Sequence, residues 1–186
     1  MKKFFFVLLI FALVLTGCQK NDFTPESGLP YEGDIENGKK QGTGTMFYEN
    51  ENIFYEGQWK DDKFNGEGKL YYEDGTLRYE GEFKDNLMQG NGKVYSEAGD
   101  LVYDGQWLEN EMSGKGKMYY DNGTLMYDGE MAKGKINGYG LFYYETGELM
   151  YKGSFRNNEL HGKGTLYSQT GNIKHDGEFR DGTKWN

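Results

Sequence analysis

The chain has 186 residues, of which 29 are Gly and 16 are Tyr, and aromatic residues make up 17% of the total. Its formal net charge of −9 argues against nucleic acid as a partner, because an acidic surface repels a phosphate backbone. Cys18 is its single cysteine, which excludes an internal disulfide and a cysteine-based metal site.

Residues 1–17 have the pattern of an export signal. Lys2 and Lys3 precede an unbroken apolar run over residues 4–15. This run is shorter than the roughly 20 residues that a membrane-spanning helix needs. The segment therefore predicts export, not a stable transmembrane anchor.

The residues at the end of this segment carry a more specific signal. Leu15-Thr16-Gly17-Cys18 resembles the signal of bacterial lipoproteins. The resemblance implies cleavage after Gly17 and acylation of Cys18, and acyl chains would tether the protein to a membrane. The alternative is a plain secretory signal with an incidental cysteine. The lipoprotein resemblance also implies the outer membrane if the bacterium has two membranes, because Gln19 follows the cysteine in place of the Asp that would favour retention in the inner membrane.

A polar stretch follows the cysteine. Residues 18–30 contain Asn, Asp, Ser, Gly and two Pro with few apolar residues, and they are predicted to form the lipidated cysteine and a linker.

Residues 31–186 repeat one pattern every 24 residues without an insertion. Six full copies begin with Tyr, at Tyr31, Tyr55, Tyr79, Tyr103, Tyr127 and Tyr151, and a truncated copy over residues 175–186 begins with His175. Each copy has Gly in third place and a bulky residue in fifth, and each full copy then has a Gly-x-Gly. A fixed period of this length is the signature of a repeat architecture.

Side-chain alternation predicts two short strands in each copy. In the second copy Tyr55, Gly57 and Trp59 fall on one face of a strand, with polar residues between them. The fold class predicted is all-β, an elongated twisted antiparallel sheet of stacked β-hairpins with about 12–13 strands between Tyr31 and Phe179.

Two kinds of connection are predicted to join these strands. Asp74-Gly75 is expected to be a two-residue hairpin turn, and a polar loop is expected around Asp61-Asp62. Glu51 occupies the place of the turn Gly in the first copy, which makes that turn the weakest prediction.

The pairing of Gly with aromatic residues predicts close packing across the strands. Gly inside a strand destabilises it unless something packs over the bare backbone. We expect Tyr and Trp rings from a neighbouring strand to lie across Gly57, Gly66 and Gly68.

The pattern Tyr-x-Gly-x-Trp followed by Gly-x-Gly resembles the MORN repeat (membrane occupation and recognition nexus), from Tyr31 to the end of the chain. The period of 24 is longer than the usual repeat of about 23, and only His161 keeps the His or Arg that often precedes the Gly-x-Gly in the family. The resemblance implies a twisted antiparallel sheet used for scaffolding, dimerisation or membrane contact.

No set of residues predicts catalysis. His161 and His175 occupy repeat positions filled elsewhere by Asn, Gln, Ser or Tyr. Asp61-Asp62 and Asp85-Asn86 are read as solvated loops and not as calcium ligands. We therefore expect no enzyme activity, no cofactor and no metal.

One aromatic column is not explained by packing on the Gly-facing side. Its members are Phe47, Tyr71, Tyr95, Tyr119, Tyr143 and Tyr167. One interpretation is that these rings shield the backbone of a curled sheet. The other is that they form a ladder that binds a glycan or an extended peptide.

The sequence thus predicts a membrane-tethered, non-catalytic binding or scaffold lipoprotein of the bacterial cell envelope. Its expected partners are the membrane, through acylated Cys18, and an unidentified protein or glycan. The alternatives are an envelope or adhesion element that self-associates as a homo-oligomer, and a lipid-contacting module.

Overall fold

The computed structural model describes residues 28–185. The predicted signal segment, Cys18 and most of the linker lie outside the described residues. The described chain is all-β, with strands β1 Tyr31–Glu36, β2 Lys39–Phe47, β3 Ile53–Lys60, β4 Lys63–Tyr71, β5 Leu77–Lys84, β6 Leu87–Tyr95, β7 Leu101–Leu108, β8 Glu111–Tyr119, β9 Leu125–Ala132, β10 Lys135–Tyr143, β11 Leu149–Arg156, β12 Glu159–Tyr167, β13 Ile173–Arg180 and β14 Thr183–Trp185.

The strands follow one another in chain order through a single sheet, β1 to β14. The pairings within this order are antiparallel, as in β3–β4 and β10–β11. Contacts divide the described chain into two compact units, a first unit of residues 28–111 and a second unit of residues 112–185. The prediction of an all-β sheet of stacked β-hairpins is confirmed.

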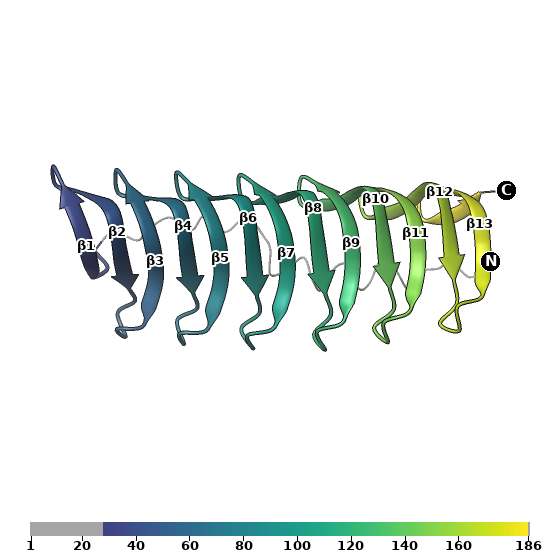
Figure 1. The fold of residues 1–186 in the computed structure, drawn as a ribbon, viewed down its shortest axis with the longest axis horizontal. Coiled ribbons are helices and arrows are strands. Elements are labelled where there is room, and N and C mark those ends of the chain that lie inside the picture. The colour runs from purple at the N-terminus through teal and green to yellow at the C-terminus, as the bar shows by residue number, and fades with distance from the viewer. Residues whose placement is uncertain (1–27, 186) are drawn as a thin grey trace. The chain divides into compact units, whose positions relative to one another are not determined.

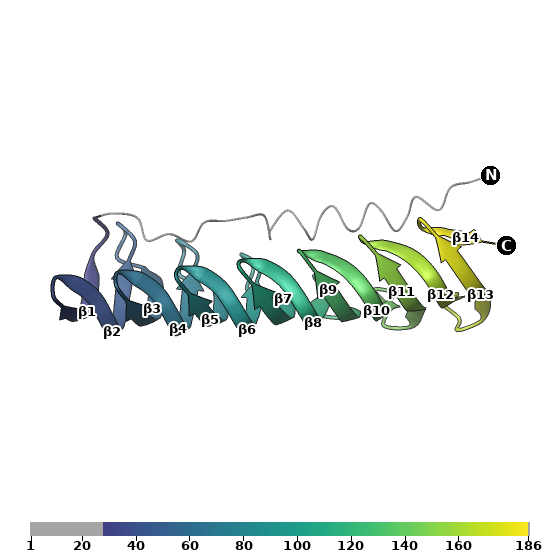
Figure 2. The same ribbon diagram turned by 90° about the horizontal axis from the view of Figure 1, so that it is seen from above.

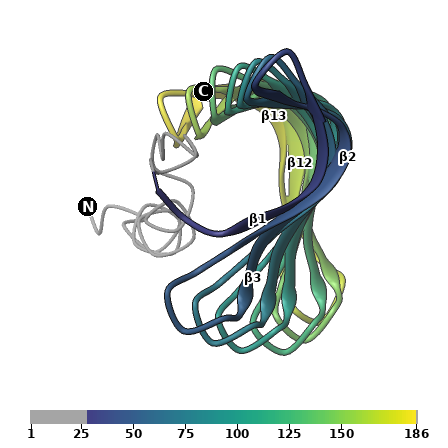
Figure 3. The same cartoon turned by 90° about the vertical axis from the view of Figure 1, so that its left-hand side faces the viewer.

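Each hairpin repeats the same design along its unit (Figure 1; Figure 2). Short turns join the two strands of one copy, and longer turns on the opposite side lead to the next copy. Viewed along the stack, each hairpin is bent and not flat (Figure 3).

The truncated copy adds a strand beyond the predicted range. Between Tyr31 and Phe179 the structure has β1 to β13, and β14 pairs with β13 through Arg180 and Thr183. Trp185 ends this short strand with 53% of its surface exposed.

The two turn predictions were wrong, because the two-residue turn and the longer turn occupy each other's predicted positions. The two-residue turn is the one at Asp61 and Asp62, where both residues have positive φ (49° and 66°). This is the requirement of a type I′ hairpin turn, and Asp and Asn tolerate it better than most residues. Asp74-Gly75 lies instead in a longer connection over residues 72–76, in which only Gly75 has positive φ, at 89°.

The first copy forms the same longer turn without the Gly. The Glu51 N–H donates to the Tyr48 carbonyl at 3.1 Å, as the Gly75 N–H does to the Tyr72 carbonyl at 2.9 Å. Glu51 adopts a φ of 68° to do so. The turn that was hardest to predict therefore forms, but with a non-Gly residue in the left-handed region.

The Tyr55 ring lies over two glycines. Gly68 is on the neighbouring strand β4, as the sequence predicts, whereas Gly57 is on β3, the same strand as Tyr55. A Cβ built on Gly68 would lie 2.6 Å from Cε2 of Tyr55, so the ring occupies the space of the missing side chain. The Tyr55 hydroxyl donates to the Gln58 carbonyl at 2.8 Å, beside a shift in strand register between Gly57 and Trp59. This bond explains why the position is Tyr and not Phe.

Gly66 does not follow this prediction. Its φ of 77° turns it away from the rings, and a Cβ there would collide with the Gln58 side chain. The physical reason is the register shift between β3 and β4, where three residues of β4, 65–67, stand opposite Gln58 alone, so the regular alternation of β4 is interrupted at Gly66.

The rings form a continuous chain of contacts within each unit. Tyr55 stacks on Phe64 at 3.9 Å between ring centroids and meets Trp59 edge-on at 5.2 Å. It also contacts Phe83 of the next copy at 5.5 Å, so its ring joins two copies. Tyr151 and Phe155 repeat the edge-on contact at 5.1 Å in the second unit. The rings of one copy are thus buried partly by contact with the rings of the next copy.

The short turns also join successive copies. The Asn86 N–H donates to the Phe64 carbonyl at 3.1 Å, and the Phe64 N–H donates to Oδ1 of Asn86 at 2.8 Å. Asn158 makes the same two bonds with Ile136 in the second unit. Each such residue therefore satisfies two backbone groups of the copy before it.

Candidate functional site

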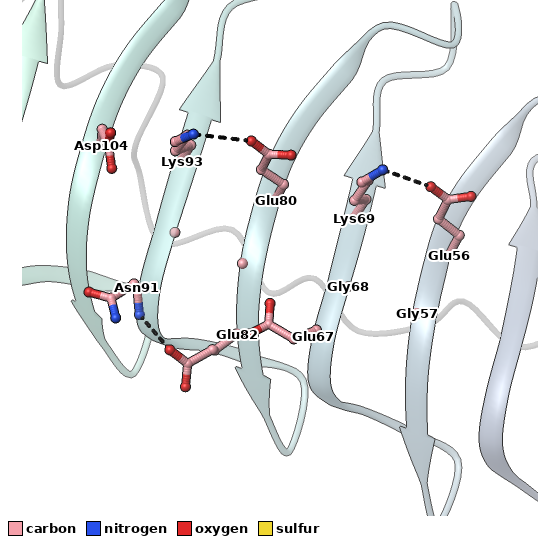
Figure 4. Close-up of a pocket in the computed structure, with 12 residues that line it drawn as sticks. Glu56, Gly57, Glu67, Gly68, Lys69, Glu80, Glu82, Asn91, Lys93 and Asp104 are labelled. Atoms are coloured by element: carbon pink, nitrogen blue, oxygen red, sulfur yellow. Dashed lines mark hydrogen bonds and ion pairs between the residues drawn. The ribbon is translucent and has the colours of Figure 1, made fainter.

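The candidate site is the face of the sheet opposite the buried Tyr rings, here called the polar face. In the first unit it carries a row of alternating charge, with one residue from each of β3 to β7. Register places these residues side by side in the order Glu56, Lys69, Glu80, Lys93 and Asp104. Figure 4 shows this row from its open side.

Ion pairs link neighbours in the row. Lys69 Nζ lies 3.4 Å from Glu56 Oε1, and Lys93 Nζ lies 3.6 Å from Glu80 Oε1. All four side chains remain partly exposed, so each pair contributes at most about 1 kcal/mol to stability. The row is better suited to present charge to a partner than to hold the fold together.

Tyr71 and Tyr95 of the predicted aromatic ladder lie beside this row. All six residues of the ladder are half-buried. The Tyr71 hydroxyl donates to Glu56 Oε1 at 2.6 Å, and the Tyr95 hydroxyl donates to Glu80 Oε1 at 2.7 Å. Burial first, and then the bond to Glu80, raise the pKa of Tyr95 to about 12. These two rings are therefore held in fixed orientations by the carboxylates of the row.

The ladder continues in the second unit with a different partner. Lys152 Nζ lies 5.8 Å from the centroid of the Tyr167 ring. Tyr119 and Tyr143 occupy the equivalent strand ends of β8 and β10. In each unit the ladder thus combines a half-buried ring surface with adjacent charge.

An open hollow of about 640 Å³ lies over the row in the first unit (Figure 4). Four glycines contribute bare backbone to its lining: Gly57, Gly68, Gly81 and Gly92. Glu67 and Glu82 stand directly opposite each other on β4 and β5, and Glu82 Oε1 accepts the Asn91 N–H at 2.9 Å. The lining carries more carboxylates than amines, so its potential favours cationic groups.

The acidic residues considered as calcium ligands serve the turns. Asp62 Oδ1 accepts the Lys40 N–H at 2.8 Å, Asp61 pairs with Lys39 at 3.1 Å, and Asp85 pairs with Lys63 at 3.2 Å. Within residues 28–185 there is no group of three or more His, Cys, Asp or Glu arranged to hold a metal ion.

Both histidines belong to the second unit. His175 occupies the Tyr position of the last copy and contacts the Glu178 carbonyl through Nε2 at 3.2 Å, which reproduces the Tyr bond. His161 Nδ1 lies 3.9 Å from Asp181, which also pairs with Arg156 at 2.8 Å. The repeat position of His175 could have predicted this contact, since His175 replaces a Tyr and its ring also carries an atom that can form a hydrogen bond.

Nothing in the described part of the chain is a helix of the length and apolarity needed to cross a membrane. Cys18, the predicted point of lipid attachment, lies outside that part.

The fold and the polar face define a class, the repeat proteins built from stacked β-hairpins. The family model described as "MORN repeat" matches residues 31–53, 55–77, 79–101, 103–125, 127–148 and 151–173. The chain therefore belongs to the MORN-repeat family, and its repeats indicate a binding or scaffold role.

The other comparisons add no functional information. No curated protein matches the chain significantly. A solved structure titled "Crystal Structure of TarM" is similar at 13% identity with a TM-score of 0.31, and the match covers 81% of this chain and 24% of that chain. A second, titled "Crystal structure of GtfA/B complex bound to UDP and GlcNAc", gives 7% identity, a TM-score of 0.19 and the same coverage. The chain thus spans about a quarter of these proteins, and the low TM-scores support no argument.

Proposed function

We propose that this protein is a membrane-tethered, non-catalytic binding or scaffold lipoprotein of the bacterial cell envelope. The observation that carries the binding role is the polar face, where half-buried rings lie beside charged side chains. The lipoprotein-like segment ending in Cys18 supports the tether. The partner is a protein or a glycan.

Partner capture is expected to depend on the ladder. A cross-linking pull-down from intact cells should recover a partner with the wild-type chain, and the double variant Tyr119→Ala, Tyr143→Ala should recover less. Each lost contact at an interface hot spot costs about 1–3 kcal/mol, which is about fivefold to about 100-fold in affinity. Neither ring is fully buried, so the melting temperature should change little.

Tyr120→Ala is the matched control for this experiment. Tyr120 is adjacent in sequence, but its hydroxyl donates to the Tyr143 carbonyl at 2.8 Å and joins two copies. The control should lower stability without a specific loss of capture. If instead the ladder variant melts at a much lower temperature and captures the partner normally, the ladder belongs to the core.

The tether is tested by Cys18→Ser. We expect this variant to move from the membrane fraction to the soluble fraction and to lose incorporation of labelled palmitate. Palmitate labelling that persists in Cys18→Ser would contradict the proposal.

Self-association is the second candidate, and one observation favours it. Ile35 on β1 occupies the position of Trp59 and yet is 66% exposed, so the first strand presents an apolar side chain. Lys40 opposes self-association through this strand, because a charged side chain occupies the repeat position at which later copies bury Phe64 or Met88. Light scattering over a range of concentrations separates the two candidates, since only self-association predicts a mass that rises with concentration.

Direct lipid contact by the repeats is the weaker alternative. The net charge of −9 opposes binding to anionic lipid heads. Binding of the Cys18→Ser chain to anionic vesicles would favour this alternative over the acyl tether.

A further inference from the structure

Two neighbouring strands in the second unit depart from the repeat on the polar face. Four positions differ in chemistry from their equivalents: Tyr139, Leu141, Lys152 and Ser154. Tyr139 replaces a Thr, Glu, Asn or Lys, and Leu141 replaces a Thr or Lys. Lys152 replaces the Asp or Glu of the six other copies, and Ser154 replaces an Asp, Glu or Gln.

The strand register brings these four residues together. On β10 and β11, Tyr139 is directly opposite Ser154 and Leu141 is directly opposite Lys152. Residues paired in this way have Cβ atoms about 5 Å apart. The four substitutions therefore form one contiguous surface, here called the Tyr139 patch.

The ring of Tyr139 is open to solvent. Its exposure is 55%, while its backbone N–H is fixed by a bond to Glu130 Oε2 at 2.8 Å. The short side chain of Ser154 leaves the space beside Gly162 open, whereas Gln58, Glu82 and Glu130 fill the equivalent space in other copies. The other exposed large hydrophobic side chains of residues 28–185 lie at strand ends or on the first strand: Ile35, Leu108, Ile173 and Trp185.

The charge beside the ring is also reversed. Lys152 is exposed, and its amine lies near the ring of Tyr167. Asp128 flanks the patch from β9, opposite Leu141. Lys152 thus places a cation in a column that is otherwise acidic, next to an exposed ring and a hydroxyl.

We propose that the Tyr139 patch binds an acidic saccharide. The apolar face of a pyranose ring would stack on Tyr139, Ser154 Oγ would bond to a sugar hydroxyl, and Lys152 would pair with the sugar carboxylate. A protein partner is less suited, because specific protein interfaces bury about 1,000 Å² or more and this patch consists of four side chains. The inference rests on the proposed binding role and names a ligand class for it.

Saturation-transfer difference NMR tests this proposal with the full-length acylated chain in detergent. The probe is trigalacturonate, and its neutral methyl ester is the matched ligand. We expect saturation of the ring protons of trigalacturonate with a Kd of about 1 mM, typical of a small open site. The methyl ester should bind at least about tenfold more weakly if Lys152 pairs with the carboxylate.

Two variants restore the chemistry of other copies and should keep the fold. Lys152→Glu returns the acidic residue, and Tyr139→Asn returns the residue found at Asn91. Each should weaken trigalacturonate binding by about tenfold or more. Lys135→Glu makes the same charge change at the start of β10 and should have no effect.

Several outcomes would overturn the proposal. Equal saturation with the wild type and Tyr139→Asn, or equal binding of acid and ester, would exclude the patch as an acidic saccharide site. Lys152-dependent retention on phosphatidylglycerol vesicles without trigalacturonate binding would assign the patch to lipid. If the wild-type chain captures a partner but does not bind trigalacturonate, this inference alone is rejected. If it binds trigalacturonate but captures no partner, the ladder is rejected as the partner site.

Discussion

At the scale of single residues, a Tyr ring occupies the space that a side chain would need at a Gly position. The Tyr55 ring fills the place where a side chain at Gly68 would stand, and its hydroxyl bonds to the Gln58 carbonyl. Gly68→Ala should therefore displace the ring and lower the free energy of unfolding by about 3 kcal/mol, at the upper end of overpacking effects. Gly75→Ala is the control, since its φ of 89° opposes Ala but no atom lies within 4 Å of the added Cβ. Chemical denaturation should show that this control lowers the free energy of unfolding by about 1 kcal/mol. Equal losses for both variants would contradict the claim that the Tyr55 ring fills the side-chain space at Gly68.

Glu51 offers a stabilising change at the same scale. Its φ of 68° places a side chain in the left-handed region, where the turns of later copies have Gly. Glu51→Gly should raise the free energy of unfolding by about 0.5–1 kcal/mol, because relief of strain exceeds the added entropy of the unfolded chain. Glu49→Gly in the same turn has no such strain to relieve and should not stabilise the protein. Thermal melting of the two variants side by side decides the point.

At the scale of elements, residues of the short turns form hydrogen bonds to the preceding copy. Asn158 accepts the Ile136 N–H through its side chain at 2.8 Å, whereas Gly134 has no side chain to offer the equivalent Met112 N–H. Gly134→Asn should add this bond and stabilise the protein by about 1 kcal/mol, because Asn tolerates the φ of 69° and nothing lies within 4 Å. Gly134→Ala is the control, with the same φ but no acceptor, and should destabilise. Asn158→Gly should lose about 1 kcal/mol in urea unfolding.

The strands could be predicted from the sequence, but the bonds between them could not. Alternation around Tyr55 and Trp59 specifies two faces, since a period of two residues is a local property. The orientation of Gly66 depends on a register shift between Gly57 and Trp59, which arises only when β3 pairs with β4. The positions of the ladder were identified in the same local way. The bond from Tyr71 to Glu56 spans two strands and follows from that pairing, so alternation alone does not predict it.

At the scale of the whole molecule, the repeated tyrosines predict how stability depends on pH. Burial is the main cause that raises the pKa of Tyr95, Tyr120 and Tyr151, each to about 12, from 10.0 for a free side chain. Burial also raises the pKa of Tyr55 and Tyr79. Between these values the unfolded chain has lost protons that the folded chain keeps, so stability must fall as pH rises.

We therefore expect full stability from these groups below about pH 10 and its progressive loss between about pH 10 and pH 12. Many tyrosines share this shift, so their losses should add and the chain should unfold cooperatively in that window. Absorbance at about 295 nm reports phenolate, and circular dichroism reports the sheet. The two signals should change together for the buried rings. Phenolate formation by all tyrosines near pH 10 with an intact sheet would show that the rings do not hold the copies together.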